Sequence, residues 1–126
     1  MSAEENKATV RRCWDEVINQ RHVAEAAAYI PAHNAELVPG ILAIFPDLRQ
    51  RIEWQVAEGD LVASGATYRG THQGEWMGIA PTGKPVTLSV IYLDRVADGR
   101  IVEHQSVADW LGALEQVGAR IVAGEA

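Results

Sequence analysis

The sequence predicts an α+β fold, in which helices come first and a run of antiparallel strands follows. Two observations carry this prediction. Apolar residues recur with a helical period in the first third of the chain, and from Leu48 onward they alternate with polar residues, as in strands. Helices that precede a twisted antiparallel sheet are expected to cover one of its faces. A chain of 126 residues has the length of one domain, so a single domain is expected over 1–126. A helix laid across a curved sheet encloses a cone-shaped space, which is the natural ligand site.

Composition excludes several classes of partner. The chain has 11 Lys and Arg against 17 Asp and Glu, a formal net charge of −6. This balance argues against nucleic acid and against an anionic membrane surface as partners. Cys13 is the single cysteine, so no intrachain disulfide and no thiolate metal site is expected. The N-terminus lacks a signal-peptide pattern and the apolar runs are too short to span a bilayer, so we expect a cytoplasmic protein without a membrane partner.

The helical elements are expected before residue 46. Ser2 and Glu5 have the spacing of a capping box and predict a helix that begins near Ala3. Its apolar face carries Val10, Trp14, Val17 and Ile18. A second, alanine-rich helical piece is expected over 23–29. It should end there, because Pro31 disfavours the helical conformation of the residue before it. After a connector at 32–34, Pro39 fits the first turn of a short helix over 39–45.

The first two strands are expected to form a hairpin. Alternation from residue 48 places Gln50, Ile52, Trp54 and Val56 on one face of the first strand. Gly59-Asp60 predicts the turn, and the return strand runs over 61–71. Three glycines and a proline then mark 72–83 as a loop, which predicts either a lid or a static crossover.

A second hairpin follows the loop. The third strand is expected over 84–97, with Val86, Leu88, Val90 and Tyr92 on one face. Asp98-Gly99 is a strong hairpin signal and leads to a fourth strand over 100–109. A terminal helix is expected over 110–117, ended by Gly118.

Four short segments occur in a characteristic order and spacing. They are Phe-Pro-Asp-Leu at 45–48, Glu-Gly-Asp at 58–60, the run GTHQGEWMGIAPTGK at 70–84, and DGRIVEH at 98–104, which is followed by Asp109. Together they resemble the SnoaL-like polyketide cyclase family within the wider NTF2-like fold. The resemblance implies helices packed on a curved antiparallel sheet around a pocket, and ring closure of a polyketide by an intramolecular aldol reaction. It also implies that neither a metal nor an organic cofactor is needed.

The resemblance identifies Asp109 as the catalytic acid and base, because it matches an aspartate near the end of the last strand of cyclase members. A carboxylate in an apolar pocket can take up and return a proton. The alternative is that Asp109 only caps the helix that begins at Trp110, since Asp is an excellent N-cap residue. Both roles are compatible if one oxygen caps the helix and the other faces the ligand.

The face of the last strand that lines the pocket is left open by the sequence. In a regular strand Glu103, Gln105 and Asp109 share one face and His104 lies on the other. A bulge would instead bring His104 into the pocket. We favour the first arrangement, with Gln105 as a hydrogen-bond donor to the substrate and His104 as a structural histidine.

Further substrate-binding candidates are mostly aromatic, because aromatic walls suit flat ligands. They are Trp14, Tyr29, Trp54, Trp76 and Tyr92, each of which could also be ordinary core packing. His33, in the expected connector, would bind a substrate oxygen at the pocket mouth or lie exposed in the loop. The histidines show neither helical i, i+4 nor His-x-His spacing, so no metal site is predicted.

The leading functional prediction is a cofactor-independent cyclase or lyase that acts on a hydrophobic, polyketide-like carbonyl compound. Asp109 would remove a proton, and Gln105 or a tyrosine would bind the enolate oxygen. One alternative is a non-catalytic small-molecule-binding domain.

Another alternative is an epoxide hydrolase or isomerase, which requires Glu53, Arg69 or Glu103 to converge on Asp109. Because Asp94 and Arg95 are adjacent, they are expected to face opposite sides of their strand, which argues against an epoxide hydrolase. The partly apolar outer face of the sheet predicts a homodimer formed through the sheet.

Overall fold

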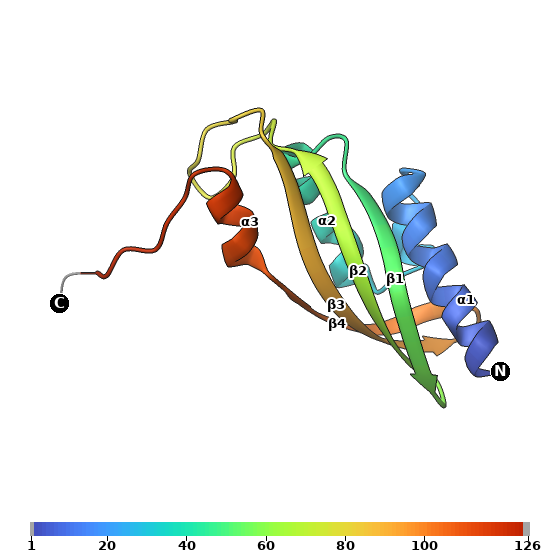
Figure 1. Cartoon of the computed structure of the whole chain (residues 1–126). Coiled ribbons are helices and arrows are strands. Elements are labelled where there is room, and N and C mark those ends of the chain that lie inside the picture. Colours follow the sequence, from blue (N-terminus) through green and yellow to red (C-terminus); the bar gives the residue numbers. More distant parts are fainter. Residues whose placement is uncertain (1, 125–126) are drawn as a thin grey trace.

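The computed structural model describes residues 2–124 and confirms the α+β architecture (Figure 1). The elements in order are α1 (Ala3–Trp14), η1 (Asp15–Asn19), η2 (Ala26–Ala28), α2 (Ala32–Ile44), β1 (Arg49–Glu58), β2 (Leu61–Thr71), β3 (Pro85–Ala97), β4 (Arg100–Ala108) and α3 (Trp110–Gln116). The strands form one antiparallel sheet in the order β1-β2-β3-β4. Within residues 2–124, no helix is long and apolar enough to cross a membrane.

Helix α1 begins where the capping box predicts. The Ser2 side chain accepts a hydrogen bond from the Glu5 backbone N–H at 3.1 Å, and the Glu5 side chain accepts one from the Ser2 backbone N–H at 3.4 Å. The apolar face of α1 and η1 is buried and contacts all four strands. We call the sheet face that α1 covers the inner face, and the opposite one the outer face.

The segment before β1 differs from the prediction. Residues 23–29 form only the short 3-10 turn η2, because Arg21 adopts a left-handed φ of 61° and few residues remain before Pro31. Pro31 then serves as the N-cap of α2, which begins at Ala32 and tolerates Pro39 in its interior. His33 therefore lies in a helix and not in a connector.

Both predicted hairpin turns are confirmed. Gly59 has a φ of 59°, and the Asp98-Gly99 pair has φ values of 53° and 75°, as a two-residue hairpin requires. Helix α3 ends before Gly118, whose φ is 96°. In Figure 1, α2 lies behind the sheet and α3 follows the far end of β4.

Two β-bulges decide which side chains face inward. In β1, Ile52 pairs with Ala66 but Trp54 pairs with the adjacent Gly65, so Glu53 is an extra residue. The strand therefore turns its next residues over: Trp54 and Val56 lie on the outer face, contrary to the prediction that they share a face with Ile52.

The second bulge lies in β4. Glu103 pairs with Arg95 but Ile101 pairs with Val96, so Val102 is the extra residue. Ile101 and His104 consequently both face inward although they are three positions apart.

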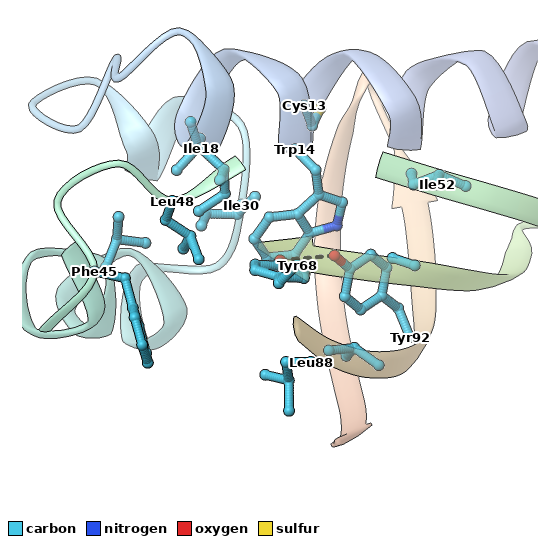
Figure 2. Close-up of a cluster of buried hydrophobic side chains, with 14 of the residues drawn as sticks. Cys13, Trp14, Ile18, Ile30, Phe45, Leu48, Ile52, Tyr68, Leu88 and Tyr92 are labelled. Carbon is cyan, nitrogen blue, oxygen red and sulfur yellow. Dashed lines mark hydrogen bonds between the residues drawn. The ribbon is translucent and has the colours of Figure 1, made fainter. Parts of the chain in front are cut away.

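The core lies between α1, α2 and the inner face. The predicted inner row of β3 is confirmed, with every second residue from Val86 to Val96 buried. Figure 2 shows Trp14 projecting from α1 toward Tyr68 and Tyr92, beside other apolar side chains of the core that include Ile18 and Leu48.

Candidate functional site

A pocket of about 240 Å³ opens between the inner face of the sheet and α2. Helix α2 contributes an apolar wall with Leu37, Val38 and Ile41. The opposite wall carries the polar or aromatic side chains Trp14, Tyr68, Tyr92, His104 and Ser106, and the rest of the lining is formed by Ile18, Asn34, Leu88, Val90, Ala108 and Trp110. An apolar cavity with a few convergent polar groups is the usual form of a small-molecule site.

A buried carboxyl group lies behind this wall. Asp94 continues the inner row of β3 and is 0 % exposed. Its Oδ2 accepts a hydrogen bond from Trp14 Nε1 at 3.1 Å, and its Oδ1 lies 2.5 Å from His104 Nδ1. A buried carboxyl group is costly unless it is hydrogen-bonded, and here each oxygen has a partner. Asp94 is therefore fixed in orientation.

His104 connects this carboxyl group to the pocket. The register places His104 directly opposite Asp94, and its side chain is only 8 % exposed. Because Nδ1 contacts the carboxylate, Nε2 is the ring nitrogen left for a ligand, and it has no hydrogen-bond partner among residues 2–124. The ring centroid lies 4.8 Å from that of Trp14 and 5.5 Å from that of Tyr92. A carboxylate-oriented histidine on an apolar pocket is suited to proton transfer.

Two buried tyrosines form the neighbouring part of the wall. The Tyr68 and Tyr92 hydroxyl oxygens lie 2.6 Å apart and share a hydrogen bond, and Gln50 Oε1 lies 3.4 Å from the Tyr92 oxygen (Figure 2 marks the tyrosine pair). Burial raises the pKa of Tyr68 to about 12 and raises the pKa of Tyr92 well above its ordinary value. Both hydroxyls therefore stay protonated near neutral pH and can donate hydrogen bonds.

Asp109 and Gln105 lie elsewhere. Asp109 is exposed, and its Oδ1 accepts a hydrogen bond from the Gly112 backbone N–H at 2.9 Å as the N-cap of α3. It borders a shallow groove on the outer face with Glu53 and Trp54, and it does not line the internal pocket. Gln105 is exposed opposite Leu93 on the same outer face. Gln105 and Asp109 share one face and His104 lies on the other, as the alternation predicts, but the Val102 bulge makes the face with His104 the inner one.

The other sequence candidates divide between the two faces. Trp14 and Tyr92 line the pocket. Trp54 is 47 % exposed on the outer face, where its indole occupies the space above Gly65. Trp76 is buried against Phe45, next to the pocket but not in its lining.

The remaining two candidates also lie outside the lining. Tyr29 is half-buried against the core, and His33 is exposed on α2, where its neighbour Asn34 reaches the pocket instead. His33 points away because the helix that contains it starts earlier than the sequence indicates.

The candidates predicted from the sequence do not include Asp94 or Trp110. The alternation of β3 could have indicated that Asp94 is buried, because Asp94 lies in phase with Val90 and Tyr92. A carboxylate is unusual in such an inward-facing row. Trp110 is 45 % exposed at the start of α3 and borders the pocket.

Of the groups named for an epoxide hydrolase, only Glu53 borders the same outer-face groove as Asp109, and neither Arg69 nor Glu103 is among the residues that line it. Arg95 pairs with Asp60 at 2.6 Å and with Glu103 at 3.1 Å on the outer surface. Over residues 2–124, no group of three or more His, Cys, Asp or Glu side chains is arranged to hold a metal ion.

Comparison with known proteins connects this geometry to a family. The model of the SnoaL-like polyketide cyclase family matches residues 9–117. The chain is 30% identical over 89 residues to nogalonic acid methyl ester cyclase from Streptomyces nogalater, an alignment that covers 70% of this chain and 66% of that protein. It is 32% identical over 69 residues to aklanonic acid methyl ester cyclase DnrD from Streptomyces peucetius, which covers 55% of this chain and 47% of that protein. The matched regions thus span less than two thirds of these curated relatives.

Solved structures agree over nearly the whole chain. AclR from Streptomyces galilaeus, described as a candidate hydroxylase, superposes with a TM-score of 0.83 at 29% identity, over 98% of this chain and 87% of that one. IdmH from Streptomyces antibioticus, described as a candidate polyketide cyclase, superposes with a TM-score of 0.75 at 28% identity, over 90% and 99% of the two chains. With a family model that matches residues 9–117 and a fold shared with these structures, the chain belongs to the SnoaL-like polyketide cyclase family.

Proposed function

We propose that this protein closes a ring in a polyketide-like carbonyl compound by an intramolecular aldol reaction, with His104 as the acid and base. The observation that carries the proposal is the contact of His104 Nδ1 with the buried carboxylate of Asp94, in the wall of an apolar pocket. The curated relatives named above are cyclases of polyketide methyl esters, which supports this substrate class.

The proposed reaction is a net isomerisation. With Nδ1–H donated to Asp94, His104 Nε2 carries a free lone pair and removes a proton from a carbon next to a carbonyl group. The enolate carbon attacks a second carbonyl carbon of the same molecule and forms the new C–C bond. The oxygen of that carbonyl takes the proton back from Nε2 and becomes a hydroxyl group. No oxidant, reductant or cofactor enters the balance.

Asp94 acts through His104 and is a positioning residue. It fixes the ring orientation and the tautomer, and it stabilises the imidazolium ion that forms during the reaction. The apolar α2 wall would exclude water from the enolate and strengthen these electrostatic interactions.

The test uses nogalonic acid methyl ester and aklanonic acid methyl ester as substrates, with chromatographic separation of the isomeric ring-closed product. We expect His104→Gln and Asp94→Asn to lower kcat by about 10²–10⁴-fold, as expected for the loss of general acid–base catalysis. The matched carboxylate control, Asp109→Asn, should stay within about threefold of the native rate, because it loses only part of a helix cap.

The opposite pattern would return the catalytic role to Asp109. If Asp109→Asn folds normally and is inactive while His104→Gln is active, the acid and base lies at the end of β4. If the native chain converts neither ester but a thermal-shift assay shows that it binds them, the small-molecule-binding alternative is the better account.

The outer face would pair two copies of the chain. Its exposed apolar side chains are Trp54, Val56, Ile91, Leu93 and Val107. They are contiguous across the sheet, since Ile91 pairs with Val107, and Ala63 pairs with both Val56 and Leu93. Large apolar patches of this kind mark interaction sites, and a symmetric dimer is their commonest solution.

Sedimentation velocity of the native chain should give twice the mass of one chain, and Val107→Lys should give a folded monomer. A native monomer at micromolar concentration would reject the dimer without affecting the proposed chemistry.

A further inference from the structure

The hydroxyl groups of Tyr68 and Tyr92 form a hydrogen-bonded pair in the pocket wall that the proton transfer at His104 does not use. Both residues line the pocket, and their hydroxyl oxygens lie 2.6 Å apart. The Tyr92 ring lies 5.5 Å from the His104 ring and 6.3 Å from the Tyr68 ring, measured between centroids. The tyrosine pair and the acid and base therefore border the same space.

The hydrogen atoms of this pair can be arranged in two ways. Each hydroxyl has one hydrogen to donate and can accept two. In one arrangement Tyr68 donates to Tyr92, and Tyr92 donates to Gln50 Oε1 across 3.4 Å. In the other, Tyr92 donates to Tyr68 at 2.6 Å, and the Tyr68 hydrogen is free to point into the pocket. A ligand oxygen would favour the second arrangement, because it accepts that hydrogen and leaves no donor unpaired.

We propose that Tyr68 is a second catalytic residue, whose hydroxyl donates a hydrogen bond to the enolate oxygen, and that Tyr92 is the positioning residue that polarises it. This inference rests on the proposed aldol reaction for its chemistry. Hydrogen bonds in a chain strengthen one another in a low-dielectric site, so donation from Tyr92 makes Tyr68 a better donor. Charge develops on the substrate oxygen as His104 removes the proton, and a donor in place at that moment stabilises the transition state more than the ground state.

Burial supports the role, because Tyr68 keeps its proton. Desolvation raises its pKa to about 12, so the hydroxyl is neutral and able to donate at physiological pH. Tyr29 offers a control tyrosine, since it packs against the core but does not line the pocket.

The first test is a binding experiment that needs no knowledge of the substrate. The probes are 2-naphthol, which carries a phenolic oxygen, and naphthalene, which lacks it, titrated into the native chain, Tyr68→Phe, Tyr92→Phe and Tyr29→Phe. We expect Tyr68→Phe to weaken 2-naphthol by about tenfold and to leave naphthalene unchanged, which corresponds to one lost hydrogen bond. Tyr92→Phe should show a smaller loss, and Tyr29→Phe none.

Two results would overturn the inference. One is that the native chain does not discriminate between 2-naphthol and naphthalene, which includes the case in which neither binds. The other is that Tyr68→Phe weakens both ligands equally, which indicates a packing role only.

The failure of the proposed reaction can be recognised separately. His104→Gln should retain the preference for 2-naphthol even if the native chain closes no ring, because the oxygen contact is made by Tyr68. Where ring closure is observed, Tyr68→Phe should lower kcat by about 10²-fold and raise KM by no more than the tenfold expected for 2-naphthol, since the hydrogen bond is stronger to the charged oxygen of the transition state than to the substrate.

Discussion

An aspartate lies near a tryptophan on each side of the sheet, and the two settings differ in burial and in hydrogen-bond partners. On the inner face Asp94 is 0 % exposed and is held by Trp14 and His104. On the outer face Asp109 is exposed, bonds a backbone N–H of α3, and lies along a groove that includes Trp54. The comparison teaches that two aspartates of the same sheet can have very different surroundings, one buried beside a histidine and the other exposed at a helix N-terminus. The surrounding donors decide the chemistry available to each carboxyl group.

The largest expected effect lies at the inner carboxylate. Asp94→Ala leaves His104 and Trp14 without their buried acceptor, and removal of one member of a buried pair typically costs about 3–5 kcal/mol in the free energy of unfolding. Urea unfolding followed by tryptophan fluorescence measures this. A decrease of less than about 1 kcal/mol in the free energy of unfolding would mean that Asp94 contributes no more to stability than a surface carboxylate.

The aliphatic residues on either side of the Glu53 bulge should separate the faces next. Ile52→Ala should lower the free energy of unfolding by about 2–4 kcal/mol, because Ile52 is buried in the core. Val56→Ala should stay within about 0.5 kcal/mol, because Val56 faces solvent in the isolated chain. Equal losses in dilute solution, where a dimer would be dissociated, would contradict the assignment of these residues to opposite faces.

High pH should weaken the inner face selectively. Tyr68 has an ordinary pKa of 10.0 that burial raises to about 12, so the unfolded chain loses this proton first. The contribution of Tyr68 to the free energy of unfolding is fully present below pH 10 and is lost as the pH rises to about 12. The total loss is about 2–3 kcal/mol. Urea unfolding at intervals between pH 9 and 12 should show this fall in the native chain and a smaller one in Tyr68→Phe. The same slope in both chains would assign the fall to other groups.

The smallest effect is expected at the outer carboxylate. Asp109→Ala removes the side-chain acceptor of the α3 N-cap, and such a loss costs about 1 kcal/mol. Differential scanning calorimetry of this variant beside Asp94→Ala compares the two carboxylates directly. If Asp109→Ala proved the more damaging of the two, the contrast between the faces would be reversed.

Much of the fold could be predicted because its signals are local. The capping box at Ser2 and Glu5, the Asp98-Gly99 turn and the glycine after α3 each act over a few residues. The alternation of β3 likewise identified its inner row. The segments that resemble the family were sufficient to identify it, and the comparisons confirm it.

The candidate site was predicted only in part. Trp14 and Tyr92 line the pocket, whereas Gln105, Asp109 and Trp54 lie outside it. For Gln105 and Trp54, the physical cause is a single extra residue in the strand, which reverses the faces of the residues expected to follow the regular alternation.

The sequence by itself determined the order of elements, the turns, the first and last helices and the family, because each depends on residues close together in the chain or on a short motif. Only the tertiary structure decided where the bulges at Glu53 and Val102 fall and which acidic side chain meets a histidine. A bulge is fixed by how a strand pairs with its neighbour and by which side chains the core must cover. The contact between Asp94 and His104 joins residues on different strands, and the one between Trp14 and Asp94 joins a helix to the sheet. Such contacts form only when the complete fold brings those elements together.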